Sequence, residues 1–333
     1  QRTRMADDST ESFHVAVTGG AGYIGSRVIE RLQATHPDWT VTGIDNFYRG
    51  DVRQVGDVEI RHVDIRERDR LEAALDGADV VIHLAAISGV DDCRNNADLA
   101  QAVNVDGTAN VAWFCRKTGA ALAFPFSMAV LGDPGQFPIT IDQPRDPMNW
   151  YGRTKVLGER LIETYADGAF PAHLFMKSNL YGGHIVDDTI VSKGTVINFF
   201  LERAMAGEPL TVYEPGSQAR NYIHVKDVAR AYVRSAERFA EQLPAGETGV
   251  EKYEIASDQD PSVMTVAERV QAIATEFDID VDVELVENPR AGEETLVEQF
   301  DVDTTAAHET LGWDTEYTVE DAIRALFERR TES

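Results

Sequence analysis

A glycine-rich segment between an apolar stretch and a helical stretch most strongly constrains how this chain of 333 residues can fold. Residues 19–25 read Gly-Gly-Ala-Gly-Tyr-Ile-Gly, and they directly follow an apolar strand expected at 13–18. Without side chains there, the backbone can turn sharply and bring its N–H groups and the start of the next helix against a pyrophosphate. Because the glycines stand between a strand and a helix, the segment predicts a dinucleotide-binding turn rather than glycines selected for packing alone.

Strands and helices alternate through the first half of the chain. Strands are expected at 13–18, 40–44, 58–63, 80–84, 121–126 and 173–177, and helices up to about residue 35 and at 68–75, 97–118 and 152–165. This alternation predicts an α/β fold, a Rossmann-type doubly wound parallel sheet with helices on both faces. After residue 179, Gly- and Pro-marked loops between shorter elements predict a smaller C-terminal α/β lobe, interleaved with the last strands of the sheet.

The expected cofactor site draws its residues from the ends of successive strands. Asp45 follows the second strand, where its carboxylate can accept hydrogen bonds from both hydroxyls of a ribose and would repel a phosphate attached to it. NAD is therefore expected, although Arg49 nearby would suit NADP. The other residues expected to bind the cofactor are Gly19, Gly22, Tyr23, Ile24, Gly25, Asn46, Asp64, Ile65, Leu84, Ala85, Ala86 and Asn104.

Three of the polar residues in this region also have an ordinary structural explanation. Asp64 at a strand end suits either the adenine amine or a simple cap. Asn104 within a helical stretch is either a cofactor-positioning amide or one that braces the helix. His83 is expected to be a hydrogen-bonded core histidine rather than a catalyst.

The domain boundaries follow from the same pattern. Residues 1–12 are polar and aperiodic, which predicts a disordered tail. We expect an NAD-binding Rossmann domain at 13–178, to which later segments near 220–258 return. The substrate-binding lobe is then expected at 179–219 and 259–330.

The charge balance limits the partners. The chain carries 57 acidic and 31 basic side chains, a formal net charge of −26, and the acids are dispersed along it. Such a charge repels nucleic acid, so no nucleic-acid partner is expected. A dispersed acidic coat suits a protein that works where salt screens its self-repulsion, which predicts a salt-rich, halophilic cytoplasm. An acidic protein of an ordinary cytoplasm is the alternative.

Two further absences bear on location. The sequence has no apolar run long enough for a membrane span and no basic-then-apolar leader, so neither a membrane partner nor a secretory signal is expected. Cys93 and Cys115 match no metal-ligand spacing, which predicts two reduced, packed thiols and no metal site. Reduced thiols indicate a cytoplasmic protein.

Tyr151 and Lys155 are the candidate catalytic residues. Their i, i+4 spacing sets both side chains on one face of a helix. An unperturbed phenol has a pKa of about 10, and a nearby ammonium and a cationic nicotinamide ring favour its ionised form. Such pairs are common on solvated helix faces, but this one follows the strand that ends near Ser127. A hydroxyl at that carboxyl edge of the sheet can hydrogen-bond the reacting oxygen of a substrate.

With these residues assembled, the chain resembles the extended short-chain dehydrogenase/reductase family. Within that family it resembles the NAD-dependent nucleotide-sugar epimerase/dehydratase branch and is similar to UDP-glucose 4-epimerases. The resemblance runs from about residue 13 to about 313. It rests on the segments 18–25, 45–46, 83–86, 104–108, 151–155, 218–220 and 311–313 and on the strand that carries Ser127.

The resemblance implies a role for each catalytic candidate. Tyr151 is the acid/base, Lys155 lowers its pKa and holds the nicotinamide ribose, and Ser127 orients the substrate. In an epimerase of this kind, Tyr151 takes the proton of the sugar 4-hydroxyl while a hydride passes to tightly bound NAD. The keto-sugar then rotates, and the hydride returns to its other face.

The residues after Ser127 narrow the reaction that the resemblance implies. Dehydratases of this branch carry an Asp-Glu pair there and decarboxylases a Glu, whereas this chain has Met128 and Ala129. Redox-neutral epimerisation is therefore favoured, with UDP-glucose and UDP-galactose, or the N-acetylated pair, as the default substrates. An NAD-dependent dehydrogenase of a free sugar or sugar acid is the alternative, and a regulator that only senses NAD is a third.

The resemblance also implies how a nucleotide sugar is bound. Asn179, Arg220 and Arg290 match the residues that hold the diphosphate, since guanidinium groups suit phosphate oxygens, and Val196 is expected beside them. Two positions depart from the pattern. Met176 stands where an arginine is usual, and the turn at 290–293 reads Arg-Ala-Gly-Glu where Pro-Gly-Asp usually follows the arginine.

Similar family members commonly dimerise through a four-helix bundle. The helices involved would be the one after Asn104 and the one that bears Tyr151. The first of them is apolar over a broad face formed by Ala109, Val111, Ala112 and Phe114, which suits either an interface or core packing. From the resemblance we expect a homodimer.

Overall fold

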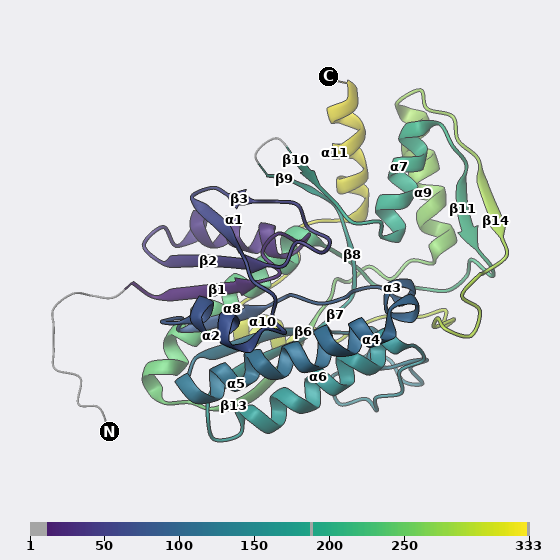
Figure 1. Cartoon of the computed structure of the whole chain (residues 1–333). Coiled ribbons are helices and arrows are strands. Elements are labelled where there is room, and N and C mark those ends of the chain that lie inside the picture. Colours follow the sequence, from purple (N-terminus) through teal and green to yellow (C-terminus); the bar gives the residue numbers. More distant parts are fainter. Residues whose placement is uncertain (1–11, 187–188, 332–333) are drawn as a thin grey trace, which may run out of the picture.

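A mostly parallel eight-stranded sheet forms the centre of the structure, a computed structural model that describes residues 12–186 and 189–331 (Figure 1). The strand order is β13 (Gly249–Ile255), β7 (Pro171–Lys177), β6 (Ala121–Ser127), β5 (Val80–His83), β1 (His14–Thr18), β2 (Thr40–Asp45), β4 (Val58–His62) and β3 (Gln54–Val55). The short β3 pairs antiparallel with β4, and the other neighbours are parallel. The order reverses between β1 and β5, where doubly wound sheets bind their ligands. The predicted Rossmann-type fold is confirmed.

Helices cover both faces of this sheet, which explains why its central strands are apolar almost throughout. One face carries α2 (Arg68–Leu75), α5 (Thr108–Thr118) and α6 (Trp150–Ala166), and the other carries α1 (Gly25–Thr35), α8 (Val225–Ala245) and α10 (Thr305–Leu311). Figure 1 shows α5 and α6 running side by side along their face, where the two helices contact each other.

The stretch expected to be helical at 97–118 is helical throughout, but its middle segment is π-helical. After α3 (Val90–Asn95), the stretch divides into α4 (Ala97–Gln101), a π-helical segment (Ala102–Gly107) and α5. The Asn104 side chain accepts a hydrogen bond from the Ile87 N–H at 2.8 Å and donates one to the Ile87 carbonyl at 2.9 Å. These bonds tie the segment to the loop after β5. Apolar spacing could not reveal the π-helical segment, because a π-bulge adds a single residue to one turn.

A smaller lobe follows β7. Its core lies between α7 (Val196–Ala206), α9 (Val263–Glu276), α11 (Val319–Thr331) and the parallel pair β11 (Leu210–Tyr213) and β14 (Val283–Val286). Two strand pairs lie between it and the sheet: β8 (Asn179–Tyr181) with β12 (Tyr222–His224), and β9 (His184–Val186) with β10 (Thr189–Val191). Figure 1 shows β11, β14, α7 and α9 grouped beyond one end of the sheet.

Part of the segment expected in this lobe packs with the sheet instead. Ala307, Leu311 and Trp313 join the core on the α1 and α8 face, and the Trp313 indole donates to the Asp227 carbonyl at 2.9 Å. The chain therefore returns to the sheet twice, first with α8 and β13 and then with α10. The exact lobe boundaries stay a prediction.

The expected disordered tail at 1–12 lies outside the described residues except for Ser12. Its hydroxyl donates to the Asp38 carbonyl at 2.5 Å, so the last residue of that segment is attached to the domain. Within the described ranges, no helix is long and apolar enough to cross a membrane.

Candidate active site

The glycine turn between β1 and α1 lines a cavity of about 480 Å³ at the carboxyl edge of the sheet. The turn leaves no room for a side chain at Gly19 or Gly25. A Cβ on Gly25 would lie 2.1 Å from the Gly19 carbonyl oxygen, and a Cβ on Gly19 would lie 2.7 Å from the Ala85 amide nitrogen. Gly25 is also the first residue of α1, so backbone N–H groups at the start of a helix border the cavity. This cradle fits the pyrophosphate of a dinucleotide.

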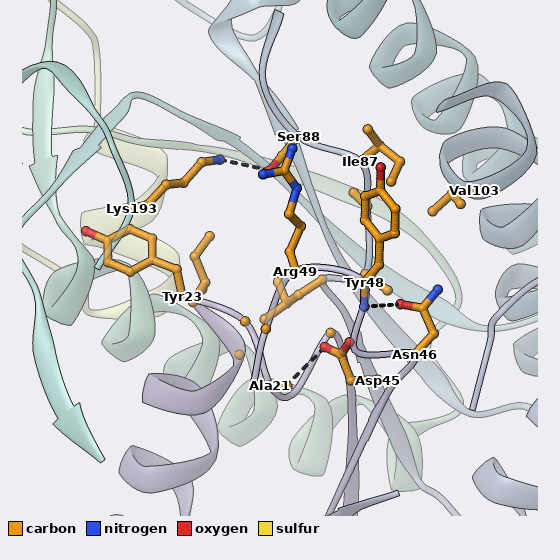
Figure 2. A pocket seen from close by; sticks show the side chains of 18 of the residues that line it. Ala21, Tyr23, Asp45, Asn46, Tyr48, Arg49, Ile87, Ser88, Val103 and Lys193 are labelled. Carbon is orange, nitrogen blue, oxygen red and sulfur yellow. Dashed lines mark hydrogen bonds between the residues drawn. The ribbon is translucent and has the colours of Figure 1, made fainter. Parts of the chain in front are cut away.

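All the residues predicted to bind the cofactor line this cavity except Asp64 and Asn104. Figure 2 shows Asp45 reaching from the end of β2 toward the glycine turn. Its carboxylate accepts hydrogen bonds from the N–H groups of Ala21 at 3.1 Å and Phe47 at 2.7 Å. Burial raises the pKa of Asp45, and these hydrogen bonds oppose that rise. The carboxylate oxygens retain lone pairs for ribose hydroxyls.

Arg49, the residue that would favour NADP, is paired with a carboxylate. Its guanidinium forms an ion pair with Asp92, and both residues line the cavity. Asp64 is similarly engaged: it accepts a hydrogen bond from Asn46 at 3.1 Å and pairs with Arg66 at 2.7 Å. The pairing of Arg49 with Asp92 favours NAD over NADP, as expected from Asp45.

Two buried polar residues support the strand ends beside the cavity. The ring nitrogens of His83 lie 2.7 Å from the Thr18 hydroxyl and 3.0 Å from the Thr108 hydroxyl. Burial, with a contribution from nearby Lys155, lowers the pKa of His83 to about 3. As expected, His83 is a satisfied core histidine. Asn104 braces its helix, since its amide bonds Ile87 and also donates to the Thr154 hydroxyl at 3.0 Å.

The start of α6 is held against the turn that follows β6. Asn149 caps the helix by accepting a hydrogen bond from the Gly152 N–H at 2.9 Å. A Cβ on Gly152 would lie 2.6 Å from the Ala129 carbonyl oxygen, so only glycine allows this approach. The helix that bears Tyr151 and Lys155 is thereby placed next to the end of β6.

Ser127, Tyr151 and Lys155 come together at this point. Tyr151 and Lys155 both line the cavity, and the Lys155 ammonium lies 5.8 Å from the centroid of the Tyr151 ring. Ser127 ends β6, and its hydroxyl accepts a hydrogen bond from the Ala129 N–H at 3.2 Å and interacts with the Tyr151 phenol. A strand end and a helix face thus bring one hydroxyl and one phenol together, and the phenol lines the cavity.

The ionisation of the pair differs from the sequence-based expectation. Burial raises the pKa of Tyr151 to about 12, with Cys93 adding to the rise and Ser127 opposing it. Burial lowers the pKa of Lys155 to about 8. Lys155 by itself therefore does not hold the pKa of Tyr151 low. A cationic nicotinamide ring against the phenol would oppose the effect of burial.

A buried ion-pair network fixes the far half of α6. Glu159 is fully buried and accepts hydrogen bonds from Arg145 at 3.0 and 2.8 Å and from the Lys252 ammonium at 2.7 Å. Burial acts to raise the pKa of Glu159, but these cations lower it overall. The network joins α6 to β13 and to the loop before the helix. Removing Glu159 would leave the Arg145 guanidinium, which is 9% exposed, without its carboxylate partner, which is strongly destabilising.

Neither Ser127 nor any of the other residues predicted to bind the substrate is among those that line the described cavity. Arg220 donates to the carbonyls of Ala219 at 2.8 Å and Thr295 at 2.7 Å, and Asn179 donates to the Asn221 carbonyl at 3.2 Å. The exposed Val196 is the first residue of α7. In a separate cluster, Arg290 forms ion pairs with Asp91 at 2.6 Å and Glu294 at 3.0 Å.

The sequence-based site omitted two lysines that line the cavity, Lys177 and Lys193. Lys193 lies between β10 and α7, and Figure 2 shows its ammonium reaching the Ser88 hydroxyl, 2.8 Å away. Lys177 ends β7, directly beside Ser127 at the end of β6. The signal that could have revealed Lys177 is a charged residue that ends an otherwise apolar strand at the catalytic edge of the sheet.

Comparisons with known proteins agree with this geometry. The model of the NAD dependent epimerase/dehydratase family matches residues 15–255. A UDP-N-acetyl-alpha-D-glucosaminuronate decarboxylase of Bacillus cytotoxicus is 29% identical over 268 residues, covering 77% of this chain and 79% of the relative. A putative UDP-glucose 4-epimerase of Methanocaldococcus jannaschii is 31% identical over 222 residues, covering 65% and 71%.

Solved structures show the same fold. The UDP-glucose-4-epimerase of Stenotrophomonas maltophila with bound NAD and formylated UDP-arabinopyranose has a TM-score of 0.82 at 24% identity, with 96% of this chain and 99% of that chain covered. Because the relatives carry out two different reactions, similarity alone does not select between them.

Proposed function

Because the chain belongs to the NAD-dependent epimerase/dehydratase family, we propose that it is a nucleotide-sugar 4-epimerase, with UDP-glucose and UDP-galactose as its default substrates. The observation that carries the proposal is the turn after β6. Ser127 is followed there by Met128 and Ala129, neither of which can exchange a proton. Elimination of water needs a second acid/base group, so Tyr151 alone suits the proton transfers of an epimerase.

Each residue then has one task. NAD, when bound, supplies a hydride acceptor that later returns the hydride. Tyr151 removes the proton of the sugar 4-hydroxyl and gives it back, and Ser127 hydrogen-bonds the same oxygen and holds it in place. Lys155 binds the nicotinamide ribose, and its charge favours the phenolate once the opposing effect of burial is offset. The cofactor is regenerated in each cycle.

Polar groups around Arg220 support a diphosphate site. Arg220 has no carboxylate partner among the described residues, and burial lowers its pKa. Gln218 Oε1 and the Tyr222 hydroxyl, on either side of it in sequence, are buried without hydrogen-bond partners in the described part of the chain. A bound nucleotide diphosphate would satisfy such groups and offset the buried charge.

The proposal is tested by incubating the protein and NAD with a panel of UDP-sugars and free sugars. We expect C4 epimers to form from UDP-sugars with no net accumulation of NADH. Product identity is followed by chromatography and NADH by absorbance. Steady NADH release with a free aldose, together with no conversion of any UDP-sugar, would contradict the proposal.

Two observations favour the second candidate, an NAD-dependent dehydrogenase of a free sugar or sugar acid. Arg290, proposed to bind the diphosphate, is already paired with Asp91 and Glu294. Met176, at the other departure from the family pattern, is fully buried in the core. Weaker binding of a nucleotide diphosphate would suit a substrate that has none. The same panel of sugars separates the two candidates.

We propose a homodimer formed through α5 and α6. Trp113 on α5 and Leu157 on α6 are large apolar residues with 38% and 46% of their surfaces exposed. Exposed apolar side chains on adjacent helices are typical of an interface.

Light scattering is expected to give twice the mass of the chain. Leu157→Glu is expected to give a monomer, because a charge would be buried at the interface. Leu285→Glu, at a similarly exposed position on β14, is the control and should remain a dimer. A monomeric wild type would contradict the proposal.

We also propose that the protein is adapted to a salt-rich cytoplasm. Its net charge of −26 implies self-repulsion that salt screens. Thermal unfolding midpoints are therefore expected to rise by several degrees from dilute buffer to molar KCl. A matched series in sucrose controls for general exclusion of a cosolute, and a midpoint that does not rise with KCl would refute the adaptation.

A further inference from the structure

Lysines are concentrated at the candidate active site. The chain has six lysines, and three of them line its cavity: Lys155, Lys177 and Lys193. Two of the three already have tasks. Lys155 is proposed to bind the nicotinamide ribose, and Lys193 donates to the Ser88 hydroxyl and lies near the Asp92 carboxylate. Lys177 has no task in the mechanism above.

Lys177 lies directly beside Ser127, the residue proposed to orient the sugar. It is the last residue of β7, and its Cα pairs in register with that of Ser127 on β6. Residues paired in register on parallel strands project their side chains to the same side of the sheet. Met176, the preceding residue, is fully buried in the core, whereas Lys177 borders the cavity.

The charge of Lys177 is not compensated by the protein. Among the described residues, its ammonium forms no hydrogen bond or ion pair, and the charged groups acting on it are Lys193 and Lys155. Burial and these two ammonium groups lower its pKa to about 7. A chain with 57 acidic residues leaves this half-buried position without one, although a cation partly removed from water and left unpaired is destabilising. Such a position suits an anion that arrives with a ligand.

The phosphates of NAD do not explain this anion. Their cradle is the glycine turn after β1, and β7 lies three strands away from β1 in the sheet. At the usual strand spacing that separation is roughly 14 Å. The part of a substrate next to Ser127 and Tyr151 is the sugar ring, because these residues act on its 4-hydroxyl. An anion beside Ser127 is therefore carried by the sugar itself.

We propose that Lys177 is a specificity-determining residue that pairs with a carboxylate on the sugar, so that the preferred substrate is a nucleotide-linked sugar acid rather than a neutral hexose. The inference rests on the proposed function, since it uses the same orientation of the 4-hydroxyl. In a uronic acid the carboxylate is attached to C5, next to the reacting C4. A group beside Ser127 is thus suitably placed to meet it.

The test compares discrimination between acidic and neutral substrates. The value of kcat/KM is measured for UDP-glucuronate and UDP-glucose with the wild type, Lys177→Met and Lys177→Arg. The wild type is expected to favour the acid at least tenfold. Lys177→Met is expected to lower the acid-to-neutral ratio by about 10- to 100-fold, because a charge-assisted hydrogen bond is lost. Lys177→Arg keeps the charge and should restore part of the ratio.

A matched control removes one positive charge elsewhere. Lys117→Met, at a surface lysine that pairs with Glu72 on α2, should leave the ratio as in the wild type. Affinities for the two UDP-sugars are also measured by calorimetry in the Tyr151→Phe background, with and without Lys177→Met. The additional change should weaken binding of UDP-glucuronate about tenfold more than binding of UDP-glucose.

The outcomes separate the two proposals. A wild type that favours neutral sugars, or a Lys177→Met variant with an unaltered ratio, overturns the assignment of Lys177 and leaves the epimerase proposal intact. Full activity of Tyr151→Phe, or no turnover of any nucleotide sugar, overturns the proposed function instead.

Discussion

Replacing Tyr151 with Phe is expected to lower kcat by about a thousandfold, the usual contribution of a positioned acid/base group. The substitution removes a single oxygen from a side chain that borders the cavity. Ser127 and Lys155 cannot replace it: the Ser127 hydroxyl is a much weaker acid, and the Lys155 ammonium lies 5.8 Å from the ring centroid. NAD affinity should change little, because the glycine turn and Asp45 are untouched.

The measurement pairs steady-state turnover of a UDP-sugar with NAD binding by fluorescence. Tyr165→Phe is the matched control, since it removes a phenol from the same helix at a position that packs on Trp113, away from the cavity. The control should retain wild-type turnover. A Tyr151→Phe variant within tenfold of the wild type would rule out Tyr151 as the acid/base.

The second large effect is expected for Gly25→Ala, which should weaken NAD binding by 100-fold or more, or prevent binding altogether. The new Cβ would lie 2.1 Å from the Gly19 carbonyl oxygen and 2.8 Å from its carbonyl carbon. Both atoms are backbone, so the turn itself must move. The N–H groups that approach the pyrophosphate would move with it.

Calorimetric titration with NAD checks this, together with circular dichroism to show that the variant is folded. Gly135→Ala is the control, because a Cβ there meets no atom of the described residues within 4 Å. It should bind NAD like the wild type. If Gly25→Ala folds and retains NAD affinity within about threefold, the turn does not form the pyrophosphate cradle.

Two lysines of the site make the stability of the folded protein depend on pH. Lys155 is only 4% exposed and, like Lys177, has a pKa lowered by burial, so the folded protein binds these protons less tightly than the unfolded chain. By proton linkage, both groups make the folded state more stable as the pH rises from about 7 toward 10. Ammonium groups that destabilise the folded state near neutral pH are typical of a site that binds anions.

The sequence alone determined the features that depend on neighbours along the chain. The glycine turn lies between a strand and a helix, Asp45 ends the next strand, and the pair at 151 and 155 lies one turn apart on α6. Turn geometry, strand ends and helix spacing are local properties, so periodicity and residue type were sufficient to predict the doubly wound sheet and the glycine turn at its carboxyl edge.

Only the tertiary structure decided the features that depend on contacts between distant segments. Asn104 ties its π-helical segment to the loop after β5 through a hydrogen bond to Ile87, and Arg290 meets Asp91, 199 residues away in sequence. Lys177 lies beside Ser127 because β6 and β7 pair in one register of the sheet. No spacing along the chain encodes that register, which strand pairing and core packing select together. The same packing leaves the Lys177 charge facing the cavity, where the sugar is proposed to bind.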